Sequence, residues 1–172
     1  MAGSVLGPHG HDFTVVAECL KQFGDEEVIF IPNPGNAGDA LIALGSYLFF
    51  DRIGLRFRLG EPDGFYPGRI LVLGGGGALT GAYPGADAAL QRNHRTCKAL
   101  VLLPHTVRAY PDLLAEMDER CTLFSRELGT RDYLEGHCSR ARVAHCHDMA
   151  FYVDERSIGA EFWNPRQLAD RG

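Results

Sequence analysis

The sequence lacks the features that mark nucleic-acid-binding, membrane-spanning and secreted proteins. It has no long run of Lys or Arg, and its formal net charge of −5 removes the usual electrostatic footprint of tight nucleic-acid binding. No apolar run approaches the roughly 20 residues of a membrane span, and the N-terminus has no basic-then-apolar signal pattern. The five Cys residues are an odd number scattered through apolar segments, which fits reduced, mostly buried thiols better than disulfides. We therefore expect a cytoplasmic protein with no nucleic-acid partner and no membrane span.

The common nucleotide-phosphate motifs are also absent. No Gly-x-Gly-x-x-Gly motif opens a long helix with an acidic residue about 20 positions later. The Walker motif is missing too, because no Lys-Ser or Lys-Thr pair follows the glycines at 74–77. These absences disfavour a nucleotide-binding Rossmann protein.

What the sequence does contain is an alternation of short apolar strands with helices. The apolar fraction of 45% and the charged fraction of 23% are typical of one globular domain. Strands that are apolar throughout, separated by helices, indicate a parallel sheet covered on both faces. We expect strands at 28–31, 55–59, 69–73, 99–103, 121–124 and 141–146, and helices at 13–20, 40–50, 86–93, 111–118 and 126–136. The predicted fold class is α/β, a Rossmann-like three-layer α/β/α domain with a mainly parallel sheet.

Three segments are expected along the chain. Residues 1–26 hold an N-terminal segment and a helix, and we expect the Gly-, Pro- and His-rich start up to residue 11 to be poorly ordered. Residues 27–153 form the Rossmann-like domain. Residues 154–172 form a C-terminal tail, expected to be a helix or arm that packs on this domain or on a neighbour.

Polar and Gly-rich residues follow the predicted strands. In a parallel α/β sheet the ligand lies beyond the carboxyl ends of the strands, so these residues converge on one edge. They are Asn36-Ala37-Gly38-Asp39, Gly74-Gly75-Gly76-Gly77, Pro104-His105, Ser125-Arg126-Glu127 and His147-Asp148.

The two loops nearest the N-terminus each allow a functional and a structural interpretation. The four glycines expose backbone N–H groups that can cradle an anion or admit a sugar ring, or they form a tight strand-to-helix turn. Asp39 caps the next helix, and a carboxylate at this edge can also bind sugar hydroxyls or accept a proton from one. Capping and binding are compatible.

The residues that follow the later strands also allow a functional and a structural interpretation. His105 suits proton transfer or anion binding, with a hydrogen-bonded structural His as the alternative. Arg126 suits bidentate binding of carboxylate or phosphate, whereas Arg126 and Glu127 are otherwise surface or interdomain charges. Cys138 and the segment 145–148 offer zinc-type ligands, but their spacing matches no standard zinc module, so we expect no metal.

Together these motifs resemble the polysaccharide pyruvyl transferase family over residues 27 to 153. Five motifs occur in the family's order. They are NAGDALI at 36–42, ILVLGGGGAL at 70–79, LPHT at 103–106, FSRE at 124–127 followed by YL at 133–134, and HDMAF at 147–151. The resemblance implies the N-terminal half of a glycosyltransferase-B-like fold, whose active site lies in the cleft between two Rossmann-like halves.

The activity implied by the resemblance is transfer of a pyruvyl group from phosphoenolpyruvate to two hydroxyls of a sugar as a ketal. The acceptor would belong to a growing exopolysaccharide or cell-wall glycan, and no metal or cofactor is implied. Asp39 would be the base or a hydroxyl ligand, and His105 a proton-transfer or anion-binding group. The substrates would be bound by Asn36, Gly38, Gly74, Gly75, Gly76, Gly77, Arg126, Glu127 and Asp148.

Family members are about twice this length, and their second half is expected to hold most of the Arg and His residues that bind phosphoenolpyruvate. Three explanations stay open. The chain is a piece of a longer protein, completes the cleft as a homodimer or with a partner domain, or has a reduced function. The alternative to an enzyme is a non-catalytic half-domain that binds a glycan or a partner protein.

Overall fold

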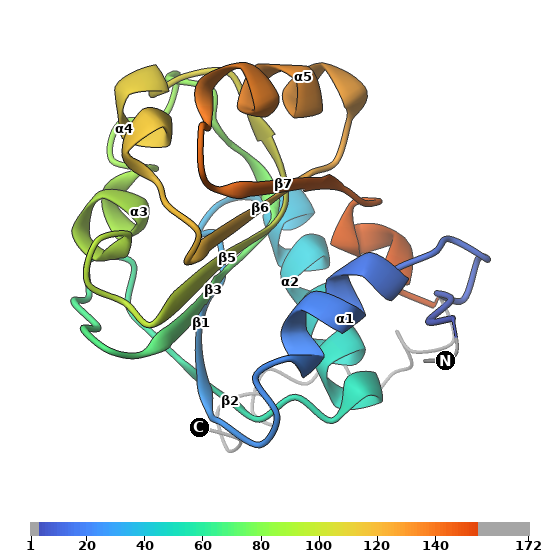
Figure 1. Ribbon diagram of the computed structural model, residues 1–172. Coiled ribbons are helices and arrows are strands. Elements are labelled where there is room, and N and C mark those ends of the chain that lie inside the picture. The colour runs from blue at the N-terminus through green and yellow to red at the C-terminus, as the bar shows by residue number, and fades with distance from the viewer. Residues whose placement is uncertain (1–3, 155–172) are drawn as a thin grey trace.

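A sheet of seven strands forms the centre of the protein, whose computed structural model describes residues 4–154 (Figure 1). Its strand order is β2-β1-β3-β5-β6-β7, with β4 paired to β5 off this path. Every strand pairing is parallel. The strands are β1 Val28–Ile31, β2 Phe57–Leu59, β3 Ile70–Leu73, β4 Gly76–Leu79, β5 Ala99–Val107, β6 Cys121–Ser125 and β7 Arg142–His145. The predicted α/β class with a parallel sheet is confirmed.

Helices cover both faces of this sheet (Figure 1). The helices α1 and α2 and the 3-10 helix η1 pack on one face, and α3, α4 and α5 pack on the other. Their bounds are α1 Thr14–Lys21, α2 Ala37–Ile53, α3 Ala88–Asn93, α4 Pro111–Glu116, α5 Leu128–His137 and η1 Met149–Tyr152. The three layers are those of a Rossmann-like domain.

Strand β1 illustrates why the strands are apolar at every position. Val28 and Phe30 belong to the core shared with α1, α2 and η1, whereas Ile29 and Ile31 belong to the core on the opposite face. Successive side chains of a strand point to opposite faces, so a sheet covered twice requires an apolar residue at each position. All four side chains are buried.

The strand order reverses direction between β1 and β3. From β1 the chain passes to β2 on one side, and all later strands lie on the other side of β1. At such a switch point the connections leave the sheet in opposite directions, and a crevice opens at the carboxyl ends of the two strands. Here β1 ends at Ile31 and β3 ends at Leu73. The sequence NPGN at 33–36 comes shortly after the first, and the four glycines come directly after the second.

The structure differs from the sequence expectation around the glycines in two ways. Of the two interpretations of the glycines, the strand-to-helix turn does not hold, because Gly76–Leu79 is strand β4, which pairs with β5 at Gly76↔His105. Strand β5 does not stop at Leu103 but continues to Val107. Pro104 inside it has no N–H to donate, and the pairing with β6 shifts register between Leu102 and His105, where the ladder tolerates that loss.

The expectation of a poorly ordered start does not hold for residues 4–11. Leu6 and Asp12 form an antiparallel bridge, and the Phe13 N–H donates to the Val5 carbonyl at 2.9 Å. Phe13 is fully buried against α2 and η1, with its ring centroid 5.2 Å from that of Tyr152. Residues 1–3 and the tail beyond Asp154 lie outside the described residues. Among helices in the described part, none is long and apolar enough to cross a membrane.

Candidate functional site

An open pocket of about 640 Å³ lies at the switch point of the sheet. Its volume is within the range of small-molecule sites. Polar lining residues come from the β1–α2 loop, the first turn of α2, β4, β5 and the start of the β6–α5 connection. Apolar lining residues come from β1, α2, β3, β5, the β4–α3 connection and α3. The polar lining residues used below are Asn33, Asn36, Asp39, Gly77, His105 and Arg126.

The carboxylate of Asp39 is held at both oxygens. Oδ1 accepts from the Asn33 side-chain amide at 2.9 Å, and Oδ2 accepts from the Asn36 N–H at 3.0 Å. The Asn36 side chain in turn accepts from the Gly38 N–H at 2.7 Å, which completes a capping box at the start of α2. Asp39 therefore has the capping role, and its orientation in the pocket is fixed by the same bonds.

The glycine loop packs directly on this pair. Gly76 has φ +140°, and a Cβ there would lie 2.8 Å from Asn33 Nδ2 and 3.1 Å from Asp39 Oδ1. Any larger residue would be strained and would push the carboxylate aside. Gly74 and Gly75 are also buried, and a Cβ there would lie 2.6 Å from the Asn33 backbone nitrogen and 2.5 Å from the Pro104 carbonyl oxygen, respectively, so both allow close backbone packing. Gly77 is partly exposed and lines the pocket.

His105 is locked in a neutral, buried state. The side chain is 2% exposed, its Nε2 accepts from the Leu79 N–H at 3.3 Å, and its Nδ1 donates to the Gly74 carbonyl at 3.3 Å. Burial is the main cause that lowers the pKa of His105 to about 4; the Gly74 carbonyl opposes it, the charge of Arg126 adds to it, and the charges of Asp148 and Asp39 oppose it. This geometry favours the structural alternative for His105, as a clamp between Gly74, which follows β3, and β4.

Arg126 presents a fixed cation to the pocket. Its Nε donates to Thr106 Oγ1 at 2.7 Å, and its Nη1 donates to Asp148 Oδ2 at 2.7 Å. Its remaining nitrogen, Nη2, would lie 3.1 Å from a Cβ at Gly77. Asp148 is itself fixed, because its Oδ1 caps η1 by accepting from the Ala150 N–H at 2.9 Å. Such anchoring leaves one guanidinium edge for a ligand.

Glu127 is not brought to the pocket. It accepts from Arg108 Nη2 at 2.9 Å and from Thr130 Oγ1 at 2.8 Å. Partial burial opposes a lower pKa for Glu127, but the Thr130 hydrogen bond and the Arg108 charge outweigh it and lower the pKa. Among the described residues that line the pocket neither Glu127 nor Asp148 occurs, so Asp148 acts through Arg126.

The sequence interpretation missed Asn33 and Tyr83. Asn33 stands inside the segment Pro32–Gly35, which has the composition of a turn, although it lies only two residues beyond Ile31, where the strand-end rule applies. It lines the pocket, and its bond to Asp39 makes it part of the site. Tyr83 lies in the β4–α3 connection and lines the pocket while remaining 59% exposed. The strand-end rule gives no signal for Tyr83.

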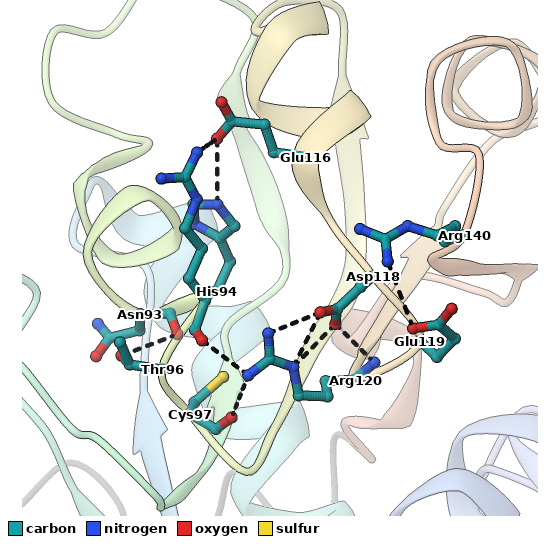
Figure 2. A network of polar contacts seen from close by, with 10 residues as sticks. Asn93, His94, Thr96, Cys97, Glu116, Asp118, Glu119, Arg120 and Arg140 are labelled. Carbon is teal, nitrogen blue, oxygen red and sulfur yellow. Dashed lines mark hydrogen bonds and ion pairs between the residues drawn. The ribbon is translucent and has the colours of Figure 1, made fainter.

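A second polar network lies at the opposite end of the sheet, where β5 and β6 begin (Figure 2). Arg120 binds the Asp118 carboxylate at 2.7 Å and the Arg95 carbonyl at 2.8 Å. The Arg120 hydrogen bonds lower the pKa of Asp118 to about 2. Beside it, Glu116 contacts Arg95 at 2.7 Å and the buried His94 at 3.4 Å. These bonds connect neighbouring loops. None of the residues in this network lines the pocket at the switch point. Within residues 4–154, no three metal-ligating side chains form a cluster.

The fold and the pocket define a Rossmann-like α/β protein with a polar, partly aromatic pocket at its topological switch point. A solved structure of this architecture is an uncharacterized protein from Klebsiella pneumoniae subsp. pneumoniae NTUH-K2044, with a TM-score of 0.74 and 30% sequence identity. The match covers 86% of this chain and 59% of the Klebsiella protein, so the chain spans less than two thirds of that protein. No protein-family model and no curated protein matches the chain.

Proposed function

We propose that the protein is polysaccharide pyruvyl transferase-like and transfers a pyruvyl group from phosphoenolpyruvate to two hydroxyls of a sugar. The observation that carries this is the convergence of two motifs on one pocket. The Asp39 carboxylate, held by Asn33 and the Asn36 N–H, lies against Gly76 of the glycine loop. Each Asp39 oxygen accepts one bond and has a further lone pair for a sugar hydroxyl.

The transfer balances as an addition followed by a displacement. One sugar oxygen bonds to the phosphate-bearing carbon of phosphoenolpyruvate, and the methylene carbon takes up a proton to become a methyl group. The second sugar oxygen then bonds to the same carbon as its bond to the phosphate oxygen breaks. The two hydroxyl protons balance the proton gained by the methyl carbon and the one that leaves with inorganic phosphate. In the proposed transfer, Asp39 accepts a hydroxyl proton.

The charges around the pocket support a sugar, rather than phosphoenolpyruvate, as its occupant. Among the described lining residues Arg126 is the one Lys or Arg, and Asp148 already pairs with it at 2.7 Å. Asp39 adds a further carboxylate to the lining. A ligand with several negative charges needs uncompensated cations, whereas a neutral polyol needs fixed donors and acceptors. The site therefore fits the acceptor, with the donor held mainly by other groups.

Phosphate release tests the proposal. The full chain is incubated with phosphoenolpyruvate and a panel of glycan acceptors, and inorganic phosphate and pyruvylated sugar are measured. We expect Asp39→Ala to lower the rate by about 10²–10⁴-fold, the usual contribution of a general base. Asp132→Ala on the exposed face of α5 is the matched control and should leave the rate unchanged. No release by the wild-type chain at concentrations where any oligomer is intact would count against the proposal.

One observation favours a second candidate, a non-catalytic module that binds a glycan. The single N–H of neutral His105 is engaged by the Gly74 carbonyl, so this side chain has no proton ready for transfer. The variants Asp39→Ala and His105→Ala separate the two candidates. An enzyme loses turnover in Asp39→Ala, whereas a binding module loses only glycan affinity and releases no phosphate in any variant.

A further inference from the structure

The connection between β4 and α3 forms the outer wall of the pocket. Tyr83, Pro84, Gly85 and Ala86 all line it. Tyr83 is the aromatic residue of this wall, and 59% of it stays exposed to solvent. A large aromatic side chain that faces a pocket without being covered by its own protein has apolar surface available to a ligand.

Both ends of this connection are anchored. At its start, the Leu79 carbonyl accepts from the Arg108 N–H at 2.9 Å. At its end, Asp87 is 7% exposed, and its carboxylate accepts from the Gln91 amide and the Tyr110 hydroxyl. Tyr110 holds φ +66°, a conformation that no other non-glycine residue adopts within residues 4–154. The wall that carries Tyr83 is therefore a braced element of the pocket.

The pocket lining combines two kinds of chemistry. The Asp39 carboxylate, the Asn33 amide and the Arg126 guanidinium line the same pocket as the Tyr83 wall, and all three are fixed by hydrogen bonds. The aromatic and apolar lining includes Tyr83, Pro84, Ala86, Ala89 and Leu90. A pyranose ring has the matching character, because its ring C–H groups form an apolar face and its hydroxyls form a polar rim.

We infer that Tyr83 is a specificity-determining residue that stacks on the ring of a neutral pyranose, whose hydroxyls are thereby directed to Asp39 and Asn33. The inference rests on the proposed function for the identity of the acceptor, and it adds the residue and the face that select a sugar ring. Stacking on an aromatic ring is sensitive to loss of the ring and insensitive to the tyrosine hydroxyl. Tyr83→Phe should therefore preserve binding, and Tyr83→Ala should not.

Titration by NMR of the full chain with neutral methyl pyranosides of glucose, galactose, mannose and N-acetylglucosamine tests the inference. We expect Tyr83→Ala to weaken binding of the best pyranoside about tenfold, in line with the effect of removing one stacking aromatic ring. Phe65→Ala is the matched control, because Phe65 is 60% exposed and lies outside the pocket lining. It should bind as the wild type does.

The outcomes separate this inference from the proposed transfer. Weaker pyranoside binding in Tyr83→Ala supports the stacking role even where phosphoenolpyruvate yields no phosphate, in which case the transfer proposal alone fails. Equal binding by Tyr83→Ala and wild type, or no pyranoside binding by the wild type, overturns the inference. Binding of uridine in place of every pyranoside, lost in Tyr83→Ala, also overturns it by assigning the wall to a nucleobase.

Discussion

The imidazole of His105 bridges the loop after β3 and strand β4, since one ring nitrogen binds the Gly74 carbonyl and the other the Leu79 N–H. Its sequence context, directly after a buried strand, equally suits a proton-transfer group. The backbone partners of the ring decide between a proton-transfer role and a structural role. One of these partners, the Leu79 N–H, belongs to β4, an element of only four residues. At the residue scale, the neutral form is the one that the fold requires.

This state predicts a pH-dependent stability. The folded pKa of about 4 lies below the reference value of 6.5, so the unfolded chain binds the proton more tightly. The stabilisation is complete above about pH 6.5 and is lost as the pH falls toward 4. Between about pH 7 and pH 5 the loss is on the order of 2 kcal/mol, from 1.36 kcal/mol for each pH unit below the unfolded pKa.

Urea unfolding at pH 7 and at pH 5 measures this loss in the free energy of unfolding. His105→Gln, which has no titrating ring, should be less stable at neutral pH but should show a flatter dependence on pH. The difference between the two proteins isolates His105 from the other titrating groups. An identical pH dependence in both would contradict the buried neutral imidazole.

Among the elements, those with a local signal were predictable from the sequence. Runs such as 28–31 and 99–103 are apolar at every position because they are covered on both faces, and both are strands. Strand β4 has no such signal, because it consists of Gly76, Gly77, Ala78 and Leu79 and forms only through its pairing with β5. The packing of Gly76 against Asn33 and Asp39 likewise joins segments that are distant in the sequence. Contacts between segments that are distant in the sequence could therefore not be predicted from local sequence patterns.

Packing between α2 and η1 gives a test at the element scale. A Cβ at Gly45 would lie 1.9 Å from the Met149 carbonyl oxygen, so the two elements touch backbone to backbone. Gly45→Ala should destabilise the protein by about 1–3 kcal/mol, the usual cost of overpacking, although alanine is the better helix former. Gly136→Ala in α5, where a Cβ meets nothing within 4 Å, is the matched control and should stabilise by about 0.5–1 kcal/mol. Thermal unfolding of both variants decides the sign, and stabilisation by both would refute the close contact.

For the whole molecule, the strand order decides which distant segments share one pocket. The reversal between β1 and β3 brings together loops that follow strands on either side of it, and the two cores cover these strands on both faces of the sheet. A ligand at this point contacts the β1–α2 loop, the glycine loop and the β4–α3 connection at once. Binding energy gained there opposes the local opening of these three segments together.

Hydrogen exchange maps this coupling. Saturation with a binding methyl pyranoside should slow amide exchange in 33–39, 76–79 and 83–90, and leave the edge strands β2 and β7 unchanged. Asp39→Ala should lose this protection at the same ligand concentration. A small depression at the opposite end of the sheet, lined by Glu26, Glu27 and Arg69, provides the internal comparison. Protection confined to that end would move the site away from the switch point, because no described residue lines both places.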